Sequence, residues 1–272
     1  MNDDKMRATA QDQDTNDEAT SQAGGLVSLV PDTLFALTER PQGSSIRAIA
    51  QATNNSRSST HRILQTLAKA GYAQQTDNGG YVVGSKLLLL AARVFGAVPV
   101  LELAHSIMRN LVDEIGETCY LATYSPADDF ITYVHRIESD HLVRFVQPLG
   151  VKLPLHAGAV GKAILAALPK VDFSSLDMVA YTARTLTSVK ELQANLSVAK
   201  KHGYATSIEE RVIGVAGVAA VVRSGDKVIG ALTVSVPLSR IPAKGLDILG
   251  VAVRKHADEL SSALTSMGVE RI

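Results

Sequence analysis

Two short apolar stripes, separated by a turn of only three polar residues, restrict the fold of this chain more than any other feature of its sequence. The first stripe consists of Ile46, Ile49 and Ala50, and the second consists of Ile63, Leu64 and Leu67. The turn between them contains Thr53, Asn54 and Asn55. Because so short a connection permits only a sharp corner, the pattern predicts two short helices packed at a steep angle.

The second predicted helix places its apolar residues late and leaves its first two turns polar and cationic. These turns hold Ser56, Arg57, Ser58, Ser59, Thr60, His61 and Arg62. Residues 72–75 and 81–83 are predicted to form short strands around the turn 77–80, which is Asp-Asn-Gly-Gly. A helix pair followed by such a hairpin is typical of a winged helix-turn-helix, whose second helix enters a groove of DNA.

The candidate DNA-binding residues are cationic or hydrogen-bonding side chains on these two helices: Arg47, Arg57, Ser58, Ser59, His61 and Arg62. We expect Arg62 to hold a phosphate, and Arg57 and Ser59 to reach base edges. The whole chain has 27 basic and 27 acidic residues, which by itself indicates no nucleic-acid partner. Residues 26–85 nevertheless carry a net charge of +2, whereas residues 1–25 carry −4, so the positive charge lies where the helix pair needs it.

The length of 272 residues and an apolar content of 46% predict two domains with a large buried core. We expect a disordered tail over residues 1–25, a winged domain over 26–84, a linker helix over 85–98 and a second domain over 99–272. The linker sequence, S-K-L-L-L-L-A-A-R-V-F, is too apolar to stand alone in water. Its expected partner is the same helix of another subunit or the flank of the winged domain.

Cysteine usage and the lengths of the apolar runs narrow the class of protein further. The single cysteine, Cys119, excludes an internal disulfide, and no Cys or His cluster has the spacing of zinc ligands. Neither a metal nor a cofactor is therefore predicted. The N-terminal residues form no secretory signal, and no apolar run is long enough to span a bilayer, so we expect a cytoplasmic protein with no membrane partner.

Beyond residue 117 the apolar period shortens towards two, which predicts strands. Strands are expected over 118–124, 130–137 and 142–147, helices over 159–168 and 189–202, a hairpin over 215–236 and a last helix over 244–266. Polar turns between consecutive strands favour an antiparallel sheet. The predicted fold class is therefore α+β, an antiparallel sheet with flanking helices, as in small-molecule sensor domains.

A predicted strand meets a helix N-terminus at P-L-H-A-G-A-V-G-K-A, residues 154–163. Free N–H groups and the helix dipole favour an anion at such a point, and we expect a carboxylate there. The G-x-x-G-K pattern lacks the spacing of a phosphate-binding loop, and Ala163 has no hydroxyl for a metal ion. In the alternative interpretation, Gly158 and Gly161 serve only tight helix packing.

Residues 203–217, followed by Thr233 and Ser235, form the other candidate constellation. Thr233 and Ser235 share one strand face, which could donate hydrogen bonds into a cavity. Glu209 and Glu210 point in opposite directions on an extended segment, so they cannot easily flank one substrate. No nucleophile and base can be paired, and we expect no enzyme. The alternative is an enzyme that uses the helix-turn-helix only for packing or dimerisation, with His156 as the base nearest the glycine loop.

Three motifs together resemble the IclR family of transcriptional regulators from Leu26 onward. They are S-S-T-H-R-I-L-Q-T-L-A-K-A-G-Y in the winged segment, P-L-H-A-G-A-V-G-K-A-I-L-A, and H-G-Y-A-T-S-I-E-E followed by G-V-A-G-V-A-A and A-L-T-V-S-V-P-L-S-R. The resemblance implies a winged-helix DNA-binding domain, a linker helix and a GAF-like effector-binding domain that senses a small organic acid or related metabolite. It also implies homodimers or homotetramers on palindromic double-stranded DNA, acting as a repressor or as an activator.

Carried over by position, the effector-binding residues are Gly158, Ala159, Val160, Ser207, Gly217, Thr233 and Ser235. The backbone amides of the first three would hold the acid group. Some family members have an acidic residue where Ser207 stands and a cysteine where Gly217 stands, so polar anchoring is weaker here and the cavity is larger at that point. Leu121, Tyr133 and Phe145 are further pocket candidates, and we expect an aromatic or acyl effector rather than a two- or three-carbon acid.

Overall fold

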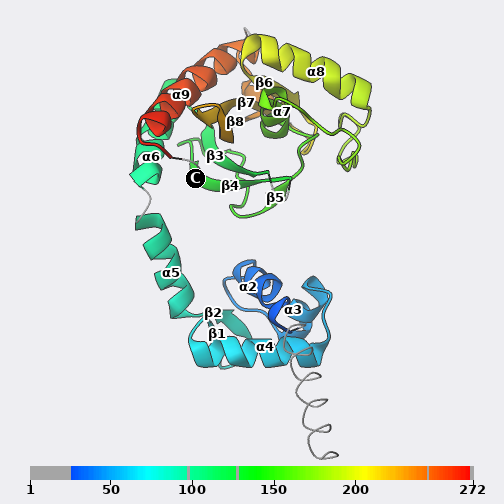
Figure 1. Cartoon of the computed structure of the whole chain (residues 1–272), viewed down its shortest axis with the longest axis vertical. Coiled ribbons are helices and arrows are strands. Elements are labelled where there is room, and N and C mark those ends of the chain that lie inside the picture. Colours follow the sequence, from blue (N-terminus) through cyan, green and yellow to red (C-terminus); the bar gives the residue numbers. More distant parts are fainter. Residues whose placement is uncertain (1–25, 97–98, 127–128, 244, 270–272) are drawn as a thin grey trace, which may run out of the picture. The chain divides into compact units, whose positions relative to one another are not determined.

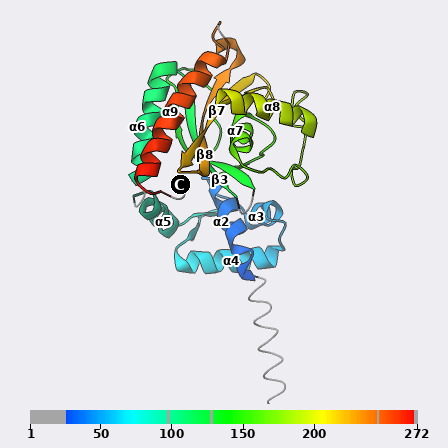
Figure 2. The same cartoon turned by 45° about the horizontal axis from the view of Figure 1, so that its top comes forward.

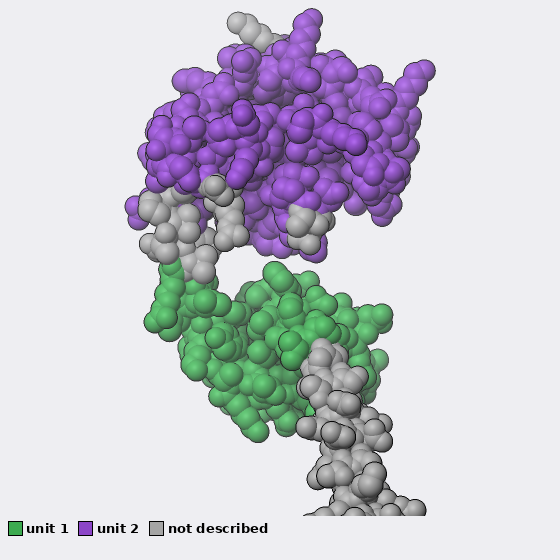
Figure 3. Space-filling model, in the orientation of Figure 1, with its two compact units in different colours: residues 1–97 green, residues 98–272 purple. Residues whose placement is uncertain are grey.

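The computed structural model describes residues 26–96, 99–126, 129–243 and 245–269. The chain divides into two compact units, residues 1–97 and residues 98–272 (Figures 1 and 3). Each unit has an apolar core of its own. The disordered tail that the sequence predicts over residues 1–25 lies outside the described residues.

The first unit is built from helices and one hairpin. Its described elements include α2 (Val30–Thr38), α3 (Ile46–Ala52), α4 (Arg57–Ala70), β1 (Ala73–Gln75), β2 (Tyr81–Val83) and α5 (Ser85–Gly96). The side chains of Ser45 and Ser56 cap α3 and α4 by accepting hydrogen bonds from amides of the first turn. Asn54, between these helices, has a φ of 53°, a left-handed conformation that asparagine tolerates. The predicted helix pair is confirmed, and Ile49 and Leu64 from its two stripes lie in the core.

The predicted wing is an antiparallel hairpin. Strands β1 and β2 pair in register from Ala73 opposite Val83 to Gln75 opposite Tyr81. Tyr81 is 2% exposed and packs into the core of the helices. The hairpin is therefore fixed to the helix pair rather than projecting freely.

The second unit contains a six-stranded antiparallel sheet with helices on both faces. Its strands are β3 (Thr118–Ser125), β4 (Phe130–Ile137), β5 (Lys152–Leu153), β6 (Ala205–Ile208), β7 (Val215–Ser224) and β8 (Lys227–Pro237), in the order β5-β4-β3-β8-β7-β6. Its helices are α6 (Pro99–Ile115), α7 (Ala159–Ala167), α8 (Val189–His202), the 3₁₀ turn η1 (Leu238–Arg240) and α9 (Asp247–Ser266). The predicted α+β class is confirmed.

The two faces of this sheet carry separate apolar cores. Helices α6 and α9 cover one face, and α7 and α8 cover the other (Figure 2). Because side chains alternate along a strand, Cys119 and Leu121 of β3 pack towards α6 and α9, whereas Tyr120 and Ala122 pack towards α7 and α8. Both faces are therefore shielded from solvent.

The prediction of a strand over residues 142–147 is wrong. Strand β4 pairs instead with the short strand β5. The Tyr120 hydroxyl donates to the Phe145 carbonyl at 3.1 Å and accepts from the Gln147 amide at 2.9 Å. The Arg136 guanidinium donates to the Gln147 carbonyl at 2.8 Å. Side chains thus satisfy backbone groups of this segment that a neighbouring strand would otherwise bind.

Candidate nucleic-acid interface and ligand pocket

Three serine hydroxyls form a hydrogen-bonded cluster at the start of α4. Ser56 Oγ accepts from the Ser59 amide at 3.1 Å and lies 3.0 Å from Ser58 Oγ and 2.9 Å from Ser59 Oγ. This cluster satisfies one of the free amides at the helix start. Ser56 and Ser58 are exposed, so the positive end of the helix dipole is open to an anion from solvent.

The predicted DNA-binding side chains lie on α3 and on the first two turns of α4. All of them are exposed except Ser59, which is half-buried. Four of them line one shallow surface hollow: Arg47, Arg57, Ser58 and His61. Gly79 of the wing turn also lines this hollow, whereas Ser59 and Arg62 do not. Within the described part of the chain, no carboxylate forms an ion pair with any arginine of this set, so their charges remain free for phosphates.

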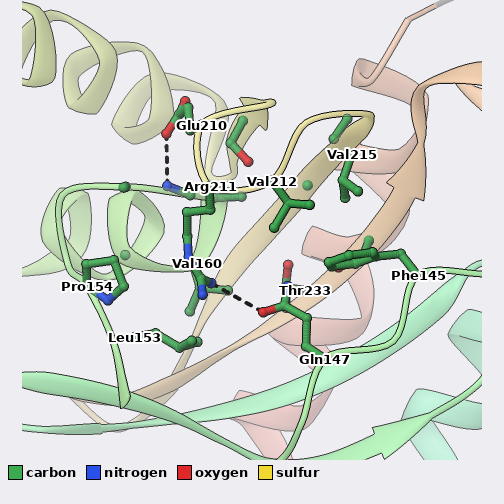
Figure 4. Close-up of a pocket in the computed structure, with 18 of the residues that line it drawn as sticks. Phe145, Gln147, Leu153, Pro154, Val160, Glu210, Arg211, Val212, Val215 and Thr233 are labelled. Carbon is green, nitrogen blue, oxygen red and sulfur yellow. Dashed lines mark hydrogen bonds between the residues drawn. The ribbon is translucent and has the colours of Figure 1, made fainter. Parts of the chain in front are cut away.

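A cavity between the start of α7, the sheet and residues 209–215 is the candidate ligand site of the second unit (Figure 4). It is lined by all seven predicted effector-binding residues: Gly158, Ala159, Val160, Ser207, Gly217, Thr233 and Ser235. Tyr133 and Phe145 also line it. Leu121 does not, because strand alternation turns its side chain to the opposite face, towards α6 and α9. The prediction that Leu121 faces the pocket is therefore wrong.

Arg211 is a pocket residue that the sequence reasoning missed. Its side chain crosses the cavity beside Val160, and Nη1 lies 3.4 Å from Gln147 Oε1 (Figure 4). Burial raises the pKa of the Tyr133 hydroxyl, and the nearby positive charge of Arg211 acts in the opposite direction. The remaining free space is about 40 Å³, room for only a few water molecules. An effector of greater size therefore requires side chains that line the cavity to move.

Lys162 and Glu210 form a buried ion pair beside the cavity. Their side chains are 1% and 8% exposed, and Lys162 Nζ bonds to Glu210 Oε1. Glu210 Oε2 accepts from the Gly158 amide at 2.9 Å, so one of the amides predicted for the effector already has a carboxylate partner. Burial lowers the pKa of Lys162, and the charge of Glu210 opposes that shift. The lysine of the G-x-x-G-K pattern is thus engaged within the protein rather than facing a ligand phosphate.

Gly158, just before α7, and Gly161, in the first turn of α7, have different roles. Gly158 has a φ of 90°, which strongly favours glycine, and it is the N-cap residue of α7. A Cβ on Gly161 would lie 2.1 Å from the Leu155 carbonyl oxygen. The alternative of tight helix packing therefore applies to Gly161. No side chain at Gly158 can cap the amides that begin α7.

The strand floor of the cavity is a row of small residues. Ser207 pairs with Gly217, and Gly217 pairs with Ser235 on the next strand. A Cβ on Gly217 would lie 3.1 Å from Ser207 Oγ, so glycine keeps this part of the cavity open. Thr233 Oγ1 donates its proton to the Val218 carbonyl at 2.8 Å. Thr233 can therefore accept a hydrogen bond from a ligand but cannot donate one at the same time.

Other reactive side chains are held away from the cavity. His156 is 1% exposed, and its Nε2 lies 2.9 Å from the Val179 carbonyl. Cys119 is fully buried on the opposite face of the sheet, where burial raises the pKa of its thiol. Of the residues described, no three His, Cys, Asp or Glu side chains gather as metal ligands would. No described helix has the length and apolar character of a membrane span.

The winged unit with its cationic helix face and the sheet domain with its cavity define a class of DNA-binding regulators. The model of the IclR helix-turn-helix domain matches residues 34–77, and that of the bacterial transcriptional regulator IclR C-terminal region matches residues 92–262. The chain belongs to the IclR family of transcriptional regulators. It is a regulator and not an enzyme, so the enzyme alternative is wrong.

Relatives over most of the chain support this assignment. The chain is 31% identical to the transcriptional repressor IclR of Escherichia coli over 229 residues, which are 82% of this chain and 84% of the relative. It is 32% identical to the probable transcriptional regulator SauR of Cupriavidus necator over 222 residues, 79% of this chain and 87% of the relative.

Two solved structures share the fold at low sequence identity. An IclR regulator from Alicyclobacillus acidocaldarius superposes with a TM-score of 0.76 at 24% identity, covering 88% of this chain and 98% of that one. An IclR homologue from Microbacterium hydrocarbonoxydans, crystallised with 4-hydroxybenzoate, has a TM-score of 0.75 at 20% identity and coverages of 89% and 99%. At these identities the likeness concerns the fold alone.

Proposed function

We propose that this chain is a ligand-responsive regulator that binds operator DNA through α4 and a small organic acid in the cavity beside α7. The observation that carries the proposal is the combination in one chain of an exposed cationic helix face and a separate polar cavity. Membership of the IclR family supports the DNA-binding half. The cavity lining supports the sensing half, because it joins polar groups with aromatic side chains.

In this proposal the residues on the exposed face divide into two roles. Arg62 holds a backbone phosphate, while Arg57 and Ser59 reach base edges in the major groove. Arg47, Ser58 and His61 flank these contacts. Arg57 and Arg62 are exposed on α4, the second helix of the winged helix-turn-helix, and this helix is the one that contacts DNA in such motifs.

The proposed effector is an aromatic or acyl carboxylate. Tyr133 and Phe145 on the cavity wall offer apolar contacts that a two-carbon acid would leave unused. The relative from Microbacterium hydrocarbonoxydans was crystallised with such an acid, 4-hydroxybenzoate. That complex supports an aromatic carboxylate as the class of effector for a protein of the same fold.

The proposed assembly is a homodimer, or a pair of dimers, on a palindromic operator. On α5, Leu88, Leu89 and Leu90 are 65%, 52% and 49% exposed. Three adjacent exposed leucines favour contact with a second copy of the same helix. The proposed action is repression, as the names of the Escherichia coli relatives IclR and AllR indicate for those proteins.

Replacement of Arg62 by alanine tests the DNA-binding half. We expect Arg62→Ala to weaken binding to all DNA sequences and to reduce the slope of log affinity against log salt by about 1, because one phosphate contact is lost. Fluorescence anisotropy at several salt concentrations measures both quantities. Lys69→Ala, in the last turn of the same helix, is the matched control. An affinity for DNA that is the same in Arg62→Ala and in the control would remove Arg62 from the interface.

A further inference from the structure

One positive charge on the cavity wall has no negative partner. Glu210 is paired with Lys162, and these two charges neutralise each other. Arg211 also lines the cavity, and among the described residues no carboxylate forms an ion pair with it. The cavity therefore has a net positive charge in a partly buried setting, where an anion is attracted more strongly than in water.

The backbone on the N-terminal side of Arg211 is held in place by several hydrogen bonds. Thr182 Oγ1 donates to the Glu209 carbonyl and Thr185 Oγ1 donates to the Glu210 carbonyl, each at 2.6 Å. The Glu210 carboxylate is itself bound at the start of α7. Because these contacts fix the chain immediately before Arg211, its side chain is directed into the cavity (Figure 4).

The hydrogen-bonding capacity of the Arg211 guanidinium is largely unused. The group has five N–H donors, and its contact with Gln147 Oε1, at 3.4 Å, is longer than an ordinary N–H···O bond. A carboxylate would replace this long neutral contact with two shorter, charge-assisted bonds. The Gly158 amide is a weaker candidate for the same task, because Glu210 already occupies it.

We propose that Arg211 binds the carboxylate of the effector and thereby selects acids over neutral compounds. The inference rests on the proposed function, since it assigns a ligand group within the same cavity. On binding, the guanidinium turns from Gln147 to the ligand. The apolar part of the ligand then lies against Tyr133 and Phe145.

Calorimetric titration of the full chain with 4-hydroxybenzoate and its neutral counterpart, 4-hydroxybenzamide, tests this role. We expect the wild-type protein to bind the benzoate at least tenfold more tightly than the amide. Arg211→Met keeps much of the side-chain length without the charge, so it should lose at least tenfold in affinity for the benzoate and none for the amide. Arg211→Lys restores the charge without the planar fork and should recover part of the loss.

Several results would overturn the role of Arg211. They are equal benzoate affinity in wild type and Arg211→Met, equal or tighter binding of the amide by the wild type, and no benzoate binding at all. Arg211 is half-buried and its contact with Gln147 is long, so we expect both variants to melt as the wild type does. If Arg211→Met does not fold, Arg211→Lys decides the question, because its benzoate affinity alone should fall.

A parallel measurement of DNA affinity separates this inference from the proposed function. If the amide binds and changes DNA affinity as strongly as the benzoate, sensing stands and only the role of Arg211 fails. If a compound binds the cavity and DNA affinity stays constant, the proposed function fails.

Discussion

At the scale of single residues, Lys162 is a charge in an otherwise apolar helix. Its ammonium group would be costly to bury alone, and Glu210 provides the compensating charge. The same carboxylate binds the Gly158 amide. One side chain therefore links the start of α7 to the loop that carries Arg211, and the shape of the cavity depends on this link.

Replacement of Lys162 by methionine isolates the contribution of this pair. We expect Lys162→Met to lower the free energy of unfolding by about 3–5 kcal/mol, because it leaves Glu210 buried without its partner. Adding Glu210→Gln removes the second charge and should recover part of the loss. Urea unfolding followed by circular dichroism measures both. Lys190→Met, at an exposed position of α8, is the control. If Lys162→Met and Lys190→Met lower the free energy of unfolding equally, the buried pair does not stabilise the fold as described.

Local motifs predicted part of the cavity and could not predict the rest. The seven predicted lining residues belong to short segments whose pattern and family resemblance point to a site. The contacts of Lys162 with Glu210 and of Arg211 with Gln147 join positions 48 and 64 residues apart. The periodicity of apolar residues along the chain contains no information about contacts between such distant positions. A lysine within an apolar helical run was the available signal that a buried partner existed.

At the scale of elements, strong periodicity predicted the helices and most strands, whereas residues 142–147 show its limit. Apolar alternation in this segment is compatible with a strand, yet side chains from distant strands satisfy its backbone. Tyr120 is central, because its hydroxyl bonds to both Phe145 and Gln147. Hydrogen bonds from side chains far along the chain therefore determine the conformation of this segment.

Removal of the Tyr120 hydroxyl tests this explanation. We expect Tyr120→Phe to cost about 1–3 kcal/mol of stability, because Tyr120 is fully buried and two backbone groups lose their partner. Amide hydrogen exchange at Gln147 should become faster. Tyr124→Phe removes a hydroxyl that bonds to the Asp129 side chain and should leave that exchange rate unchanged. Equal exchange at Gln147 in wild type and Tyr120→Phe would show that the hydroxyl does not hold the segment.

At the scale of the whole molecule, the two units supply different halves of one proposed response. Occupation of the cavity would act on the second unit, and the linker helix α5 would pass the change to the spacing of the recognition helices in a dimer. The energy required is modest, since a coupling of about 1–3 kcal/mol changes DNA affinity roughly 5- to 150-fold. Residue patterns predicted the two units, the DNA-binding role of the first and an anion site at the start of α7, whereas the full set of effector-binding residues came from the family resemblance.

The most direct test is footprinting of the full chain on the DNA upstream of its own gene, with and without 4-hydroxybenzoate. We predict two protected half-sites, as a symmetric dimer requires, and a change of at least fivefold in the protein concentration that gives half protection when the acid is added. Protection that stays the same at acid concentrations shown by calorimetry to fill the cavity would contradict the account.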